Sequence, residues 1–224
     1  MKSNKFLVTI FSAILLSVFL SSNVFAASGY ARVYYFTGTG ALGSGTTSTI
    51  SSYLTNMGYS SARGLNNTVS TITSAFSSRE VVHILCHGYY ADSTHKGGGL
   101  QCVPGSLNPV DWIWANNLTN SMSQAELIFF ESCYSGCTNP SNGRLDSTCI
   151  GLGAQSTIAF VNEITASSSS DGIHYFSQRV YYYLGQGYDI TTSVYYAQTN
   201  TINMYGSYYG ADSCVVQGGS NTIL

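Results

Sequence analysis

Two stretches of this chain decide its fold: residues 81–88 read VVHILCHG, and residues 127–136 read LIFFESCYSG. Each opens with an almost continuous apolar run, which is typical of strands buried on both faces of a parallel sheet. Polar residues follow, with His87 and Gly88 after the first run and Cys133 after the second. Because the carboxyl ends of parallel strands meet at one edge of a sheet, we expect an imidazole and a thiol to lie together there.

Further strands and helices alternate along the rest of the chain. Runs of β-branched, aromatic or apolar residues predict strands at 31–36, 157–161 and 213–217. The helical spacing of apolar residues predicts helices over 50–57 and 69–76, around Trp112 and Trp114, behind Asp171 as far as Gly185, and behind Asp189. This order implies an α/β fold, a three-layer sandwich with a mostly parallel sheet covered on both faces. The glycine- and serine-rich stretches at 38–45 and 166–170 are expected to be loops.

The first 26 residues are typical of an export signal. Lys2 and Lys5 precede an apolar run over residues 6–20, and a small-residue junction, Val24-Phe25-Ala26, follows. The run is short for a membrane span, and no second run of spanning length follows it. We therefore expect residues 1–26 to be a signal peptide and residues 27–224 to be one mature domain that is secreted, extracellular and no longer attached to the membrane.

Charge argues against nucleic acid as a partner. Without Lys2 and Lys5, six basic residues face ten acidic ones, and no Lys/Arg cluster is present to neutralise phosphates. The 18 tyrosines are interpreted as half-buried packing residues, with an adhesive or binding surface as the alternative.

An imidazole and a thiol at one sheet edge are the groups that thiol acyl transfer requires. The thiolate attacks a carbonyl carbon, and a nearby imidazole manages the protons. Small residues beside them leave backbone N–H groups free, and we expect those of Gly88 and Cys133 to converge on the developing oxyanion. His87 and Cys133 are therefore the candidate catalytic pair.

The two stretches resemble the marks of the caspase-like (clan CD) cysteine peptidases, which are an apolar strand ending in His-Gly and a later one ending in a short motif with Cys. Residues 131–136, ESCYSG, look like the acid-x-Cys-x-Ser-Gly motif of metacaspases and legumains. Residues 82–89, VHILCHGY, look more like CHAT-type members, a likeness that extends over roughly residues 80–200. The resemblance implies a caspase-like fold, with His87 as general acid/base, Cys133 as nucleophile and the Gly88 backbone as oxyanion donor.

The resemblance also implies a specificity pocket lined by Glu131. Strand alternation puts Glu131 and Cys133, two residues apart, on the same face. Metacaspases with an acid at this position prefer Arg or Lys before the scissile bond, whereas legumains prefer Asn, and we expect Arg or Lys. Glu163, after the next strand, is a candidate second carboxylate at the pocket rim, with a solvated loop residue as the alternative.

Two rival sites are rejected. Zinc would use His83, His87, Cys133 and Cys137, but residues i and i+4 of a strand lie about 13 Å apart, which is too far for one ion. Residues 38–43, GTGALG, match a dinucleotide fingerprint but lack the acid expected roughly 20 residues on. We expect no metal site and no cofactor, and we leave activation by calcium open.

An exported chain can form disulfides, and this one has six cysteines. Reserving Cys133 leaves five, so at least one other is free or bonded elsewhere. Cys137 with Cys149 is the expected bridge, because it would clamp the loop behind the nucleophile.

The sequence thus predicts a secreted cysteine endopeptidase that cleaves protein or peptide substrates. The first alternative is a catalytically silent caspase-like fold that acts as an extracellular binding module. The second is a structural surface protein, which would hold Cys133 in a permanent disulfide.

Overall fold

A computed structural model describes residues 29–224 except 38–39, 89–96, 104–105, 107 and 220–221. The expected signal peptide, residues 1–26, lies outside the described residues. Within the described part, no helix combines the length and the apolar character needed to cross a membrane.

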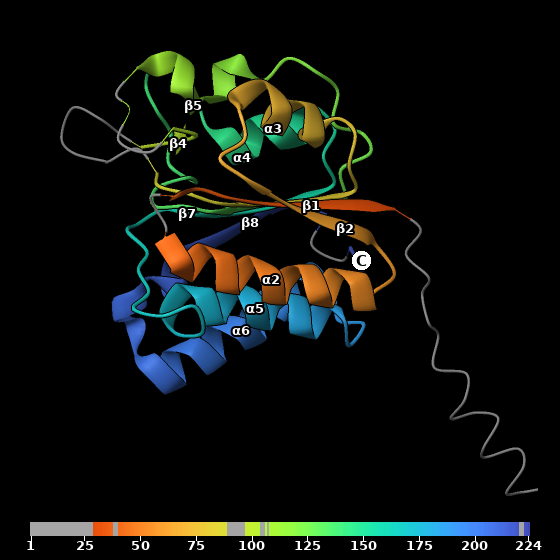
Figure 1. The fold of residues 1–224 in the computed structure, drawn as a ribbon, viewed down its shortest axis with the longest axis vertical. Helices are drawn as coiled ribbons and strands as arrows, with labels where there is room; N and C mark the ends of the chain where they lie inside the picture. Colours follow the sequence, from red (N-terminus) through yellow and green to blue (C-terminus); the bar gives the residue numbers. More distant parts are fainter. Residues whose placement is uncertain (1–28, 38–39, 89–96, 104–105, 107, 220–221) are drawn as a thin grey trace, which may run out of the picture.

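A central six-stranded sheet organises the chain (Figure 1). Its order is β2-β1-β3-β6-β7-β8. The strands are β1 (Tyr30–Tyr35), β2 (Ser60–Leu65), β3 (Val81–Leu85), β6 (Leu127–Glu131), β7 (Ser156–Phe160) and β8 (Cys214–Gly218). All neighbours pair in parallel except β8, which runs antiparallel to β7. The mostly parallel sheet expected from the apolar runs is confirmed.

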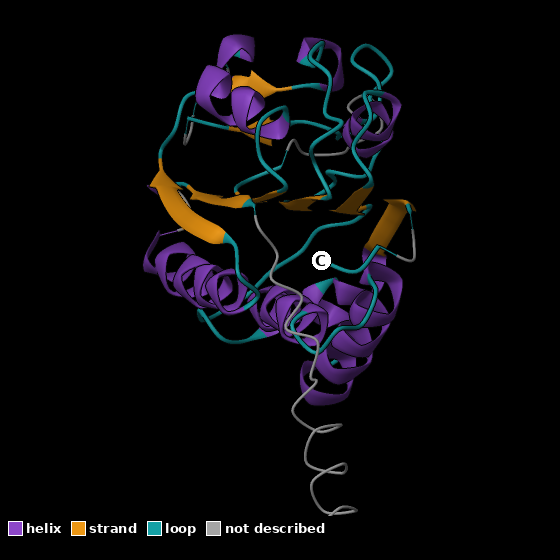
Figure 2. Ribbon diagram, turned by 90° about the vertical axis from the view of Figure 1, so that its right-hand side faces the viewer, coloured by secondary structure: helices purple, strands orange, loops and turns teal. Residues whose placement is uncertain are grey.

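Helices cover both faces of this sheet (Figures 1 and 2). One face carries α2 (Gly40–Asn56), α5 (Gly172–Leu184) and α6 (Ile190–Tyr205), and the other carries α3 (Val69–Phe76) and α4 (Leu145–Gly151). A two-stranded sheet of β4 (Leu100–Gln101) and β5 (Trp112–Ile113) lies on the α3 side. Short 3-10 helices are η2 (Pro109–Asp111), η3 (Ala115–Asn117), η4 (Ser207–Tyr209) and η5 (Ala211–Ser213). The three-layer sandwich is confirmed.

The continuous apolar runs supply two cores at once. Within β6, Ile128 and Phe130 belong to the cluster shared with α3 and α4, whereas Leu127 and Phe129 belong to the cluster shared with α2, α5 and α6. Alternate residues of a strand point to opposite faces, so a strand covered on both faces is apolar at every position. Glu131, the last residue of β6, falls on the α5 side by the same alternation.

Polar side chains mark where three helices begin. Thr68 caps α3 and Asp189 caps α6, each accepting a hydrogen bond from the N–H three residues on. Asp171 stands at the start of α5 as expected, but its carboxylate accepts from the N–H groups of Ser167 and Ser168. It therefore closes the serine-rich loop against the helix instead of capping helical N–H groups.

The glycine-rich stretch was expected to be a loop, and from Gly40 onward this is wrong. It forms the first turns of α2, where Thr46 and Thr47 are fully buried. Their hydroxyls donate to the carbonyls of Leu42 and Gly43, one turn back. Burial of this helix against the sheet outweighs the low helix propensity of glycine.

Two other expectations also need correction. The segment around Trp112 and Trp114 is β5 flanked by 3-10 turns rather than a helix, and the two indole rings stack with centroids 5.7 Å apart. β2 and α4 were not predicted from the sequence. β2 is a polar edge strand with little burial, so it carries no apolar run that periodicity can detect.

Asp189→Ala tests the cap of α6. Without the carboxylate the Thr192 N–H loses its acceptor at the helix start, and we expect the free energy of unfolding to fall by about 1 kcal/mol. Asp189→Asn keeps an acceptor and is the matched control, with a clearly smaller expected loss. Urea unfolding followed by circular dichroism measures both, and equal losses would contradict the capping role.

Candidate active site

The structure brings His87 and Cys133 to one edge of the sheet. Leu85 at the end of β3 is the register partner of Glu131 at the end of β6, and each candidate residue follows its strand by two positions. Both side chains line one cavity of about 220 Å³. His87 is exposed and Cys133 is partly buried. The imidazole and the thiol therefore share a single opening in the surface.

Gly88 allows the two strand ends to approach so closely. A Cβ atom at position 88 would lie 1.7 Å from the carbonyl oxygen of Cys133. Gly88 also bridges to Leu100 of β4, next to a hydrogen bond that Gln101 N–H donates to the His87 carbonyl. The backbone at Gly88 is thus held between β4 and Cys133, with no room for a side chain.

The turn at Cys133 is fastened to the end of β7. Tyr134 adopts a left-handed φ of 55°, which is uncommon for a residue other than glycine, and its N–H donates to the Asn162 carbonyl. Gly136 N–H donates to the Phe160 carbonyl, and the buried Ser135 hydroxyl accepts from the Phe160 N–H. Backbone bonds from the neighbouring strand therefore hold the turn in this unusual conformation.

The thiol of Cys133 faces the loop after β7. Its Sγ lies 3.4 Å from both the N and the O of Ile164. Burial raises the pKa of Cys133, the Ile164 backbone opposes this rise, and the nearby carboxylate of Glu163 adds to it. The net effect is upward, so the resting thiol is protonated at neutral pH.

Glu131 lines the same cavity as Cys133, but its carboxylate is buried and has partners that the sequence did not predict. The residue is 2% exposed. Its Oε1 lies 2.5 Å from Nδ1 of His174 on α5, and its Oε2 lies 3.0 Å from Nε2 of His83 on β3. Glu131 is therefore not a bare carboxylate at the bottom of a pocket.

Glu163 is exposed and is not one of the described residues that line this cavity. Its location matches the alternative of a solvated loop residue. Its link with the site is electrostatic, because it contributes to the raised pKa of Cys133.

The expected bridge between Cys137 and Cys149 is absent, and all six cysteines are free thiols. Cys149 is fully buried in the apolar cluster on the α3 and α4 side. Cys137 Sγ instead lies 3.2 Å from the carbonyl oxygen of Val161, beyond the end of β7. Hydrogen bonds to β7 and to the residues just after it hold the turn that the bridge was expected to clamp.

Two parts of the cavity wall were missed from the sequence: His174 and residues 164–166. His174 directly follows the apolar Ile173 and lies in the first turn of α5. The sequence gives one weak signal for it, since a histidine stands beside residues with helical apolar spacing. Which strand that helix turn faces is a tertiary property.

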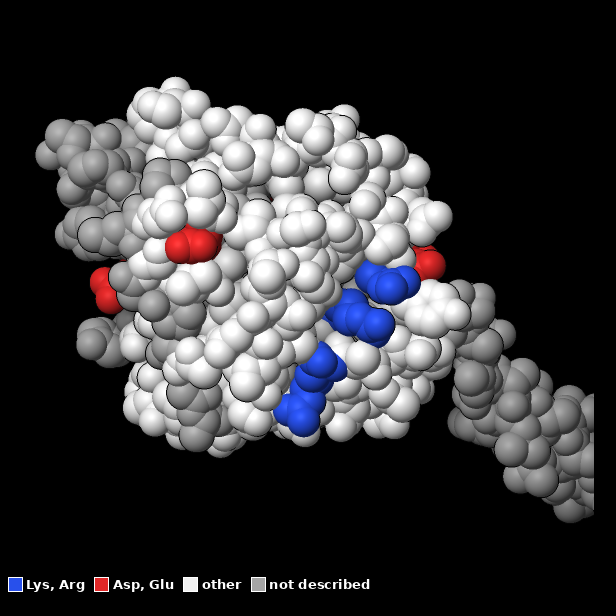
Figure 3. All heavy atoms as spheres, turned by 45° about the horizontal axis from the view of Figure 1, so that its top comes forward, with Lys and Arg blue, Asp and Glu red and all other residues white. Residues whose placement is uncertain are grey.

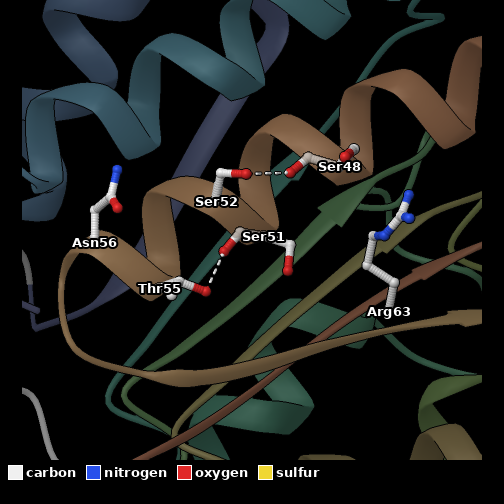
Figure 4. A pocket seen from close by; sticks show the side chains of 6 residues that line it. All are labelled: Ser48, Ser51, Ser52, Thr55, Asn56 and Arg63. Carbon is white, nitrogen blue, oxygen red and sulfur yellow. Dashed lines mark hydrogen bonds between the residues drawn. The ribbon is translucent and has the colours of Figure 1, made fainter.

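A second hollow lies on α2 and β2 and is lined by Ser48, Ser51, Ser52, Thr55, Asn56 and Arg63 (Figure 4). Several of its polar groups already have partners within the fold. Ser52 and Thr55 donate to carbonyls one turn back along α2, and Arg63 donates to the Ser44 carbonyl. We assign no chemistry to this hollow.

Charged side chains are sparse on the face in Figure 3, where a short row of arginines crosses an otherwise mostly uncharged surface. Among the described residues, no group of three or more His, Cys, Asp or Glu side chains is placed to hold a metal ion.

No protein-family model matches this chain, and no curated protein does. Solved structures do match it. Two crystal structures of the Saccharomyces cerevisiae separase–securin complex align with TM-scores of 0.54 and 0.53, each at 12% sequence identity. The alignments cover 85% and 91% of this chain but only 12% and 13% of the matched chains. The chain has a caspase-like fold. At this identity the likeness concerns the fold alone and assigns no role to any side chain.

Gly88→Ala tests the close approach of the strand ends. The added Cβ meets a backbone carbonyl that cannot rotate away, so we expect the free energy of unfolding to fall by at least about 1–3 kcal/mol. Gly151→Ala in α4 is the matched control, because nothing lies within 4 Å of its added Cβ, and no loss is expected there. Thermal unfolding measures both variants. Equal stability of the two would contradict the tight contact.

Glu163→Gln tests the electrostatic contribution to the thiol. Removing the negative charge lowers the pKa of Cys133, so iodoacetamide should label Cys133 faster near neutral pH. The gain should shrink in high salt, since Glu163 is exposed. Asp212→Asn removes an exposed charge that does not contribute to this pKa and serves as the control. Peptide mapping after timed alkylation gives the rates, and an unchanged rate in Glu163→Gln would refute the coupling.

Proposed function

We propose that this chain is a cysteine endopeptidase that hydrolyses peptide bonds through an acyl-enzyme on Cys133. The contact between the Gly88 backbone and the Cys133 carbonyl carries this proposal, because it joins the two strand ends at one cavity. An imidazole and a thiol at such a cavity supply the base and the nucleophile of acyl transfer.

The reaction proceeds in two halves. As Sγ of Cys133 attacks the substrate carbonyl carbon, the thiol proton passes to His87. The C–N bond then breaks, and His87 gives the proton to the leaving amine. Water next attacks the thioester with His87 as base, which releases the acid and restores the thiol. Because burial keeps the resting thiol protonated, proton transfer to His87 accompanies the attack.

The oxyanion is assigned to the backbone N–H groups of Gly88 and Cys133. Because position 88 has no side chain, the main chain after β3 lies directly against that of Cys133, beside the cavity that His87 and Cys133 line. Donors of this kind typically contribute about 10²–10³-fold in kcat.

Arg or Lys before the scissile bond is the proposed preference. Glu131 is the only carboxylate among the described residues that line the cavity. Its carboxylate is buried beside His83, and its negative charge in the cavity wall would favour a cationic side chain. The export signal expected in residues 1–26 supports extracellular proteins or peptides as substrates.

A catalytically silent binding module is the second candidate. Tyr188, Tyr195 and Tyr196, on α6 and the turn before it, expose 41%, 61% and 38% of their surface. Exposed tyrosines are common in binding surfaces. In that case the thiol of Cys133 stays protonated and does not act as a nucleophile.

Cys133→Ala and His87→Ala separate these two functions. We expect Cys133→Ala to abolish hydrolysis of fluorogenic peptides with Arg or Lys before the reporter, and His87→Ala to lower kcat by about 10²–10⁴-fold. Cys137→Ala removes a neighbouring thiol and should retain activity. Mass spectrometry should also trap an acyl adduct on Cys133 in the wild-type chain. A wild-type chain that cleaves no peptide of a broad panel and forms no adduct would favour the binding module.

A further inference from the structure

Four buried polar side chains form a line between the sheet and α5 that ends at the cavity. Tyr181 on α5 places its hydroxyl 3.3 Å from Nδ1 of His83, and the opposite nitrogen of His83 lies 3.0 Å from Glu131. Glu131 then contacts Nδ1 of His174 at 2.5 Å. Their exposed fractions run from 0% at Tyr181 and His83 to 7% at His174. The line therefore connects the interior with the cavity, where Glu131 and His174 both belong to the wall.

The two ends of the Glu131 carboxylate differ. Oε1 shares a short hydrogen bond with His174, whereas Oε2 is buried and lies 3.0 Å from Nε2 of His83 without hydrogen-bond geometry. Because Oε2 is enclosed, a bound substrate side chain would sense the charge of Glu131 and His174 from the cavity, whose wall includes both residues.

Electrostatics fix the state of this pair. Burial alone raises the pKa of Glu131, but His174 and His83 outweigh it and bring the pKa to about 2. Burial lowers the pKa of His174, but Glu131 outweighs this and the net shift is upward, with Asp171 adding to it. With His174 protonated the pair carries no net charge, and with His174 neutral it carries a full negative charge.

The other titratable groups around His174 come from three parts of the described chain. They are His83 of β3 with Cys86 and His87 just after it, Glu131 of β6 with Cys133 after it, and Tyr181 of α5 with Asp171 at its start. The facing residue of α2 is Leu42, and the loop after β7 contributes Ile164, Thr165 and Ala166, none of which titrates. Glu131 is the one group of this set in hydrogen-bond contact with the His174 ring.

We propose that His174 is a specificity-determining residue that switches the charge of the pocket beside Cys133. Protonated His174 neutralises Glu131 and weakens selection of Arg or Lys over a neutral side chain. Neutral His174 leaves the pair with Glu131 negatively charged beside the substrate and strengthens that selection. This inference rests on the proposed peptidase function and names the residue that regulates its substrate choice.

Raising the pH through the titration of His174 removes a positive charge from the pocket, so selection for a cationic side chain should increase. The effect should reach roughly ten-fold or more, because the charges lie a few ångströms apart in a poorly solvated site.

The kinetic test compares two peptides that differ only in having arginine or its neutral isostere citrulline before the scissile bond. Their ratio of kcat/KM cancels the ionisation of the catalytic pair, which both substrates share. In wild type the ratio should rise with pH. In His174→Gln it should be high and flat, and in Glu131→Gln it should be near one and flat. A ratio that does not change with pH in wild type, or that still rises in His174→Gln, would overturn the proposal.

A binding test keeps the inference separate from the peptidase activity. In Cys133→Ala, butylguanidinium and butylurea can be titrated at several pH values while the histidine resonances are followed by NMR. We expect the affinity for butylguanidinium alone to rise as His174 loses its proton. If wild type cleaves neither peptide but this binding pattern is found, the proposed function fails and the switch stands. If peptides are cleaved but guanidinium binding ignores the His174 titration, the switch fails and the peptidase stands.

Discussion

The carboxylate of Glu131 is buried where the sheet meets α5, and the need to pair its charge constrains the neighbouring side chains and the packing of α5. A buried charge persists only when it is paired, and removing one partner of a buried pair typically costs about 3–5 kcal/mol. The pairing requires His83 on β3 and His174 on α5 at the same time. The packing of α5 on the sheet is therefore tied to the electrostatics of the cavity. A displacement of this helix would disturb the pocket as well as the core.

The sheet edge at which His87 and Cys133 meet could be predicted because its causes are local. Continuous apolar runs indicate parallel strands covered on both faces, and parallel strands place their carboxyl ends together. The register pairing of Leu85 with Glu131 shows that the ends of β3 and β6 lie side by side. Gly88 is needed for the same reason. The strand ends come so close that the Cα of residue 88 can carry only a hydrogen on the side that faces the Cys133 carbonyl.

The partners of Glu131 could not be predicted, because they depend on how a distant helix is rotated. His174 lies 43 positions from Glu131, and helical spacing identifies an apolar stripe without saying which strand the neighbouring residue meets. The loop predicted over the glycine-rich start of α2 was wrong for a related reason, because burial of Thr46 and Thr47 outweighs the low local helix propensity. The likeness to separase is limited in the same way. The fold is shared at 12% identity, but this likeness does not assign roles to the side chains of the site.

The unbridged cysteines make the response of the chain to oxidants depend on whether it is folded. Cys86, Cys102 and Cys149 are buried in the core, and burial raises the pKa of Cys102 to about 12, so the folded protein presents these sulfurs to oxidants in their least reactive state. Unfolding in an oxidising medium releases all six at once, and random pairing then competes with refolding. Under such conditions loss of structure becomes irreversible, and the working lifetime of the molecule is set by how rarely it opens.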